Sequence, residues 1–140
     1  MNPLTLEYIA ALAQQLAFIS ALLGGFAAAF FATLLVSQSP KRVAGWAAGL
    51  AAVSATCFIG ATMVAAFLSV AAHPDAPARI AASAQNVSIR AVMGLLMILG
   101  IYTLFGALGT AGWVRSRALG IVTASAGVVG AGLATWALSL

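Results

Sequence analysis

The sequence predicts an all-α integral membrane protein with four transmembrane helices. Of its 140 residues, 64% are hydrophobic and only 6% are charged, so the chain cannot present the charged surface that keeps a soluble domain in solution. The apolar residues form long runs separated by short polar stretches, and about 20 apolar helical residues cross a bilayer. We therefore expect a single four-helix transmembrane domain over residues 1–140, with spans at about 5–37, 43–72, 78–114 and 118–138.

The first span has two faces that differ in side-chain size. From Leu16 to Val36 it carries no charged residue. Small residues recur at every fourth position and would let other helices approach closely. They are Ser20, Gly24, Ala28 and Ala32, with Ala21, Gly25 and Ala29 in a row beside them. The opposite side carries Phe18, Leu22, Phe26 and Phe30. We therefore expect this helix to lie at the centre of a homo-oligomer.

Prolines and basic residues mark the boundaries of the other spans. Pro40 ends the first span, and Lys41 with Arg42 marks an aqueous boundary. The segment 73–77, H-P-D-A-P, separates the second and third spans, and Asp75 is placed to cap the helix that follows. The connection W-V-R-S-R-A is short enough to force an antiparallel hairpin between the last two spans.

Polar residues between positions 76 and 90 fall on one stripe of a helix, at spacings of four, three and four. They are Arg79, Ser83, Asn86 and Arg90. This piece either lies in the membrane interface or projects into water as the start of the third span. Because no helix breaker separates it from the apolar run that follows, we favour one long third helix. Small-residue rows also occur on the second and fourth spans, where they predict packing faces. These rows are Gly45, Gly49, Ala52 and Thr56, and Thr123, Gly127, Ala131 and Thr135.

The sequence lacks the residues that catalysis would need. Its two acidic residues are Glu7 and Asp75, and its one histidine is His73, so it offers no carboxylate pair, metal cluster or activated nucleophile. We interpret His73 and Asp75 as parts of a solvated loop, although their proximity also resembles half of a metal or proton-relay site. We therefore expect no enzyme, no catalytic residue, no cofactor and no metal site. The spans also lack the intramembrane charges typical of coupled transporters.

The basic residues bear on orientation and partners. Four of them lie in the first and third connections, against two arginines on the other side, so the positive-inside rule favours cytoplasmic first and third loops and external termini. The pI near 10.3 indicates contact with anionic lipid headgroups and not with nucleic acid. We expect an integral protein of the plasma membrane or a bacterial inner membrane.

The stretch from Ser20 to Ala27, S-A-L-L-G-G-F-A, resembles the pore helix of the Orai family, the calcium-release-activated calcium channels. The family pattern is close to S-A-L-L-S-G-F-A, followed six residues later by a pore-mouth glutamate. Fainter similarity continues in the second span from Ser54, and from Gly100 to the terminal Trp-Val-Arg of the third. The resemblance implies a hexameric ion channel with cytoplasmic termini, opposite to the orientation that the charge bias favours. It also implies a set of pore-lining residues: Phe18, Leu22, Phe26, Ala29 and Thr33.

The sequence departs from the family at the positions that would select the ion. The selectivity glutamate falls on Thr33, and the basic inner section falls on Phe18 and Gln14. Hydroxyl groups carry no charge to offset the dehydration of calcium, so we expect no calcium selectivity at that ring. Leu22, Phe26 and Ala29 would form an apolar gate, and Lys41 with Arg42 at the pore mouth would repel cations and tolerate anions.

The sequence thus predicts an ion channel or pore that resembles Orai channels, with an apolar gate and no carboxylate ring. An alternative is a non-conducting membrane subunit or scaffold that anchors or regulates a partner protein. In that case the same residues face lipid or a neighbouring helix. A third interpretation is a pore whose opening harms the cell, such as a defence effector. The expected partners are the lipid bilayer, further copies of the chain and a regulatory protein.

Overall fold

The computed structural model describes residues 6–37, 41–73, 75–84 and 86–139. Within them lie five helices: α1 (Leu6–Val36), α2 (Arg42–Ala71), α3 (Ala78–Ala84), α4 (Val87–Arg115) and α5 (Arg117–Leu138). Four of the helices, all except α3, are long and apolar enough to cross a membrane. The predicted all-α membrane fold with four transmembrane helices is confirmed.

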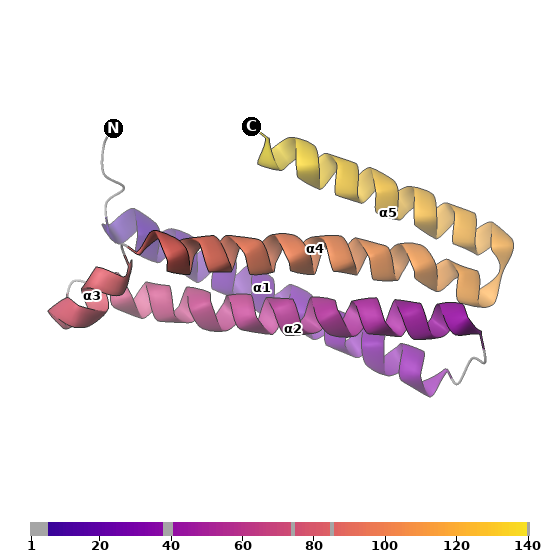
Figure 1. Ribbon diagram of the computed structural model, residues 1–140, viewed down its shortest axis with the longest axis horizontal. Coiled ribbons are helices and arrows are strands. Elements are labelled where there is room, and N and C mark those ends of the chain that lie inside the picture. Colours follow the sequence, from indigo (N-terminus) through magenta and orange to yellow (C-terminus); the bar gives the residue numbers. More distant parts are fainter. Residues whose placement is uncertain (1–5, 38–40, 74, 85, 140) are drawn as a thin grey trace.

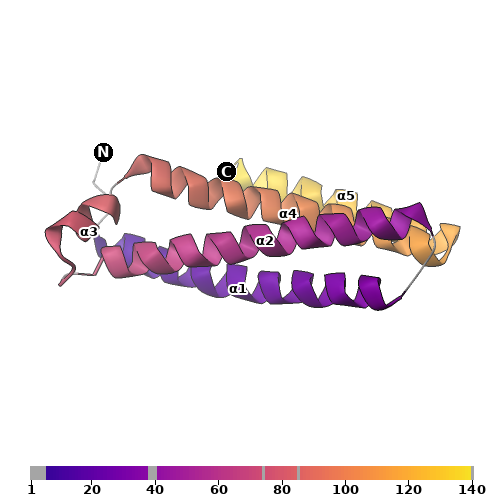
Figure 2. The same ribbon diagram turned by 60° about the horizontal axis from the view of Figure 1, so that its bottom comes forward.

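The long helices form an open array and not a closed bundle. Each packs along the next in the order α1, α2, α4, α5, and among the described residues no comparable contact joins α1 to α4 or α5. Figures 1 and 2 show neighbouring helices running in opposite directions, with α1 at one edge of the array. The beginning of α1 and the short helix α3 lie at one end of the molecule, and α5 runs toward that end but stops about midway (Figure 1).

Helix α2 contributes most of the buried side chains, and most of these are alanines. Alanine lets neighbouring helices approach closely on both sides of α2. The largest fully buried side chain is Phe58, which lies between Gly24 of α1 and Gly100 of α4. The centre of the single chain is therefore α2. A central place for α1 in an oligomer stays a prediction, because it concerns other copies.

Hydroxyl groups join neighbouring helices inside the array. Ser20 and Ser54 are fully buried. The Ser20 hydroxyl lies 3.0 Å from the hydroxyl of Thr62, and Ser54 donates to the carbonyl of Gly100 at 2.9 Å. Each bond satisfies a polar group that hydrocarbon could not solvate, and such bonds hold membrane helices together by roughly 0.6 kcal/mol each. The two contacts fix α2 against α1 on one side and against α4 on the other.

The predicted hairpin and packing row of the last two spans are both present. Ser116 alone joins α4 to α5, and its hydroxyl accepts a hydrogen bond from the Leu119 N–H at 3.2 Å. The Thr123 hydroxyl donates to the carbonyl of Gly109 at 3.2 Å, and Gly127 lies close to Gly109 as well. The row on α5 therefore packs against α4.

The prediction of one continuous third helix is wrong. Helix α3 ends at Ala84 and α4 begins at Val87, with residue 85 outside the described residues. The backbone of Asn86 is extended, and its side-chain oxygen accepts a hydrogen bond from the Ser88 N–H at 2.9 Å. Asparagine is a favoured N-cap, so a residue assigned to the polar stripe instead starts a new helix.

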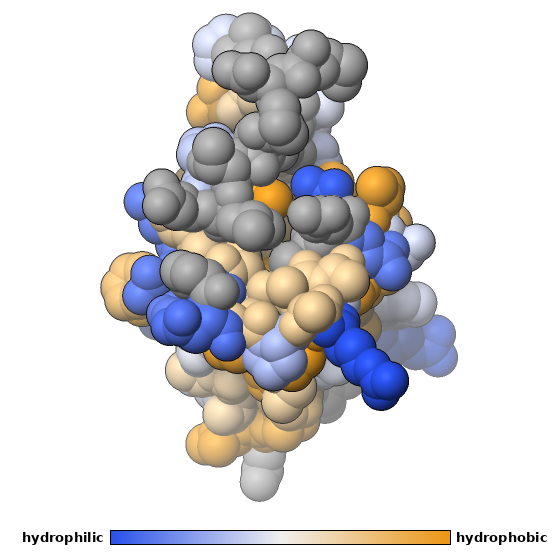
Figure 3. All heavy atoms as spheres, turned by 90° about the vertical axis from the view of Figure 1, so that its left-hand side faces the viewer, coloured by the Kyte–Doolittle hydropathy of each residue, from blue (hydrophilic) through white to orange (hydrophobic). Residues whose placement is uncertain are grey.

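Because of this break, α3 is a separate short helix at one end of the molecule. Figure 3 looks onto that end, where hydrophilic side chains gather among apolar ones. Arg79 of α3 is exposed there, and so are His73 and Asp75 in the preceding loop. This end is therefore suited to the boundary between lipid and water.

The uncovered face of α1 as candidate functional site

Helix α1 is covered by α2 along one seam only. Its buried residues are Ile9, Ala13, Ser20, Gly24 and Ala27, whose spacings of three, four or seven positions keep one seam facing a partner helix. Ile9 packs with Ala71 and Ala72 near the end of α2, and Ala27 packs with Phe58 and Ala55. The rest of the circumference of α1 has no covering helix in the described chain.

The predicted pore-lining residues lie on this uncovered face. Phe18, Leu22 and Phe26 are 72%, 66% and 53% exposed, and Ala29 and Thr33 are exposed as well. Their spacings of four, four, three and four positions place them on one side of a helix. The structure therefore brings all five together as a single stripe, while their role as a pore lining stays a prediction.

Two local contacts order this stripe. The rings of Phe26 and Phe30 are stacked, with centroids 6.4 Å apart. The Thr33 hydroxyl donates to the carbonyl of Ala29 at 2.9 Å, so its proton is used within α1. What Thr33 offers outward is an oxygen with free lone pairs but no charge. The stripe is thus apolar along most of its length and weakly polar at one end.

Small residues divide between the covered and the uncovered side of α1. Ser20 and Gly24 are buried against α2, whereas Ala28 and Ala32 from the same row are exposed. The second row is exposed throughout, and a Cβ added at Gly25 would meet no atom within 4 Å. Gly25 lines a shallow hollow of about 630 Å³ between Leu22 and Phe26. This side of α1 is therefore open to a further helix or to lipid.

The basic residues predicted at the pore mouth lie at the opposite end of the molecule from α3. Lys41 and Arg42 are exposed, and the Lys41 ammonium donates to the carbonyl of Val114 at 2.7 Å. This contact ties the start of α2 to the last turn of α4, next to Arg115. Sequence reasoning missed it, because no sequence pattern links two residues that are 73 positions apart.

The loop between α2 and α3 exposes His73 and Asp75 to solvent. His73 Nδ1 lies 3.7 Å from Asp75 Oδ2, and both side chains are largely exposed. The expected solvated loop is confirmed, but the expected cap is not formed, because α3 begins at Ala78 and the Asp75 carboxylate faces His73. Among the described residues, no three His, Cys, Asp or Glu side chains gather as they would to hold a metal ion.

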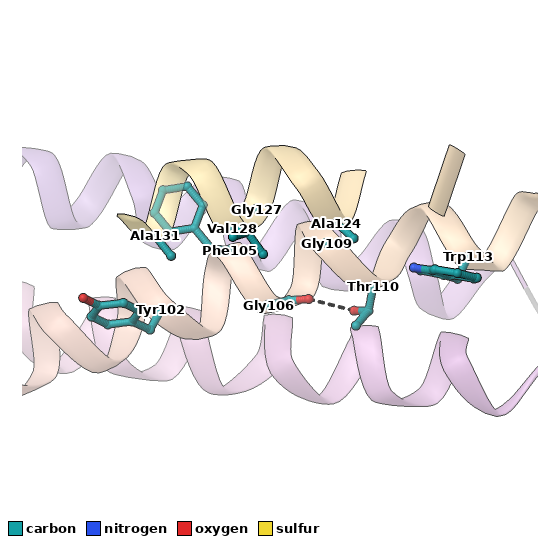
Figure 4. Close-up of a pocket in the computed structure, with 10 residues that line it drawn as sticks. All are labelled: Tyr102, Phe105, Gly106, Gly109, Thr110, Trp113, Ala124, Gly127, Val128 and Ala131. Carbon is teal, nitrogen blue, oxygen red and sulfur yellow. Dashed lines mark hydrogen bonds between the residues drawn. The ribbon is translucent and has the colours of Figure 1, made fainter. Parts of the chain in front are cut away.

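A second hollow, of about 380 Å³, lies between α4 and α5 (Figure 4). Its walls include the aromatic rings of Tyr102, Phe105 and Trp113. The Thr110 hydroxyl donates to the carbonyl of Gly106 at 2.8 Å, within α4. The hollow is an open packing seam between the two helices.

Comparison with known proteins adds no family to this description. No family model matches the chain, and neither does any curated protein or solved structure. The fold and the composition nevertheless define the class, which is an integral membrane protein with four transmembrane helices. Within that class, the uncovered stripe on α1 carries the residues that the sequence predicts to line a pore.

Proposed function

We propose that this chain forms a homo-oligomeric ion channel or pore, similar in plan to Orai channels, with α1 around the axis. The observation that carries the proposal is the open array, in which α1 occupies an edge and is covered only by α2. Copies arranged around an axis would close the array by bringing their α1 helices together. The uncovered stripe would then face the axis.

The exposed apolar side chains of α1 supply a gate in this proposal. Phe18, Leu22 and Phe26 occupy three successive turns. A ring of such side chains narrows a pore and closes it by excluding water, without any mechanical plug. The pore is therefore closed at rest and opens when these side chains move apart or become more polar.

The charges favour anions or weak selectivity over calcium. Thr33 supplies only neutral oxygen atoms, whereas calcium sites use charged carboxylates. Lys41 and Arg42 carry positive charge at the end where α1 leads into α2, and repetition around a ring would raise that charge at the pore mouth. An anion would meet less resistance there than a divalent cation.

The proposal is tested by ion flux into liposomes that contain the purified chain, with separate fluorescent reporters for chloride and for calcium. The wild-type chain and the gate variant Leu22→Ser are measured beside protein-free liposomes. Because the apolar ring closes the pore at rest, we expect chloride flux through the wild-type chain to stay near the protein-free level. Flux through the variant should rise well above it. Absence of flux in both, with normal insertion, would contradict a pore.

The second candidate function is a non-conducting subunit that holds a partner protein. It is favoured by the exposed small residues beside the stripe, notably Gly25, against which a partner helix could pack closely. Cross-linking in the native membrane separates the two functions. Cysteines placed at Ala21 and Gly25 would join copies of the chain in a pore, and would join the chain to a different protein in a scaffold.

A further inference from the structure

The net charge of the protein is concentrated at one end. Lys41, Arg42, Arg115 and Arg117 are all exposed at the end where α1 leads into α2 and α4 into α5, on the right of Figure 1. Both acidic residues belong to the opposite end, Glu7 in the first turn of α1 and Asp75 between α2 and α3, together with two arginines. The four clustered cations therefore account for the whole net charge of +4.

These cations lack an anionic partner within the described part of the chain. Lys41 is held by the neutral carbonyl of Val114, and the ion pair between His73 and Asp75 lies at the other end. The Lys41 contact brings its ammonium to the residue before Arg115, so charges from two connections meet at one place. Only an anion from outside the chain could neutralise these charges. At the depth of the lipid headgroups, the abundant anions are lipid phosphates.

An apolar hollow of about 540 Å³ begins at this cluster and continues along α2. Its lining runs from Arg42 to Val53 and is apolar beyond Arg42: Gly45, Trp46, Gly49, Leu50 and Val53. The eleven positions from Arg42 to Val53 correspond to about 16 Å of helix. The hydrocarbon of one leaflet is about 15 Å deep, half of the bilayer core, so the hollow matches the length of a lipid tail.

Two glycines keep this hollow open. A Cβ added at Gly45 or at Gly49 would meet no atom within 4 Å, so at these positions the backbone of α2 is bare. On the far side, Leu50 lies against Gly106 of α4 and closes the floor of the hollow. Trp46 is 73% exposed, one turn after Arg42, where an indole prefers the interface between headgroups and hydrocarbon.

We propose that this end of the protein binds one anionic phospholipid. Its phosphate is neutralised by Arg42 together with the neighbouring Arg115 and Arg117, and one acyl chain lies over Gly45 and Gly49 in the hollow. The cations alone would suit any phosphate. The apolar hollow is what favours a lipid over a free phosphate. A ligand that occupies both the basic cluster and the hollow needs an anionic group at one end and a hydrocarbon chain at the other.

The test measures binding of phosphatidylglycerol and of phosphatidylcholine with identical acyl chains to the detergent-purified protein, by native mass spectrometry. We expect selective retention of phosphatidylglycerol. Arg42→Gln should weaken this retention about fivefold, which is the effect of one basic residue near an anionic surface. The matched control is Arg79→Gln, which removes the same charge from α3 at the other end and should leave retention unchanged.

A second pair of variants tests the hollow without changing charge. Gly49→Leu and, independently, Gly45→Leu fill the bare backbone, and each should weaken phosphatidylglycerol binding several-fold while the helical content and the elution volume stay the same. Inorganic phosphate at millimolar concentration should not compete. Equal effects of Arg42→Gln and Arg79→Gln, full binding by a folded leucine variant, or competition by phosphate would each overturn the proposal.

Discussion

The aromatic ring of Phe58 lies directly against Gly100. A Cβ placed on residue 100 would come within 3.0 to 3.1 Å of three ring atoms, and the ring is fully buried between α1 and α4. The Ser54 hydroxyl, one turn earlier on α2, donates to the carbonyl of the same glycine. The contact between α2 and α4 thus depends on the absence of a side chain at position 100.

We predict that Gly100→Ala destabilises the protein by about 1–3 kcal/mol, because the added methyl group would force the fully buried ring of Phe58 to shift by a few tenths of an ångström. Thermal unfolding in detergent measures the effect. Gly132→Ala is the matched control, since a Cβ there would meet no atom within 4 Å. That control should be neutral or stabilising, because alanine favours a helix by about 1 kcal/mol over glycine. Equal stability of the two variants would contradict the close contact.

We predict that Gly112→Ala disrupts the hairpin of α4 and α5. A Cβ at position 112 would lie 2.5 Å from the backbone carbonyl oxygen of Leu119 and would overlap the Thr123 hydroxyl. Because a backbone atom cannot rotate aside as a side chain can, the two helices would have to separate. The ring of Phe105 reaches Gly130 across the two helices, so cysteines introduced at these two positions can be joined by a short bifunctional reagent. That cross-linking should fall sharply. Unchanged cross-linking would show that the hairpin tolerates the added methyl group.

We predict that Leu22→Ser and Phe26→Ser each raise ion leak several-fold. Both side chains are exposed on the uncovered stripe of α1, and a hydroxyl would hydrate an apolar constriction. Single-channel recording or liposome flux measures the change. Val128→Ser on α5 serves as the control, because Val128 is equally exposed but far from α1 in the array. Leak in all three variants would indicate general damage and not a gate.

We predict that Thr33→Glu creates or increases divalent-cation current, because carboxylates repeated around a pore supply the charged oxygen ligands that calcium prefers. Calcium and barium currents in planar bilayers measure the effect. Thr33→Gln is the matched control, since it has nearly the same size but no charge. Unchanged conductance in Thr33→Glu, with normal assembly, would argue against a pore at this position.

The sequence predicts the number of spans and most of their ends, because hydrophobic length and prolines determine them locally. The start of the third span is the exception, since α4 begins at Val87. The sequence does not predict which small-residue row finds a partner. Ser20 and Gly24 are buried, whereas Gly45 and Gly49 are open, although the two pairs have the same spacing. The difference depends on which helix packs against each row. Phe58 of α2 packs against Gly24, whereas a Cβ at Gly45 or Gly49 would meet no atom within 4 Å.

The break between α3 and α4 and the clustering of the basic residues were also not predicted from the sequence. Asn86 fits the polar stripe as well as it fits a cap, and the extended backbone of the folded chain decides between them. Likewise, Lys41 reaches Val114 only because α2 and α4 are neighbours. For the candidate site, the sequence placed five residues on one face of α1, and the structure leaves that face uncovered.

The oligomeric state tests the central claim most directly, because the proposed pore exists only between copies of the chain. It is measured by mass photometry in nanodiscs together with single-particle imaging of the same sample. We expect a closed ring of about five or more copies, with the α1 helices at the axis and Phe18, Leu22 and Phe26 facing it. A monomer or dimer would leave no central pore and would contradict the account.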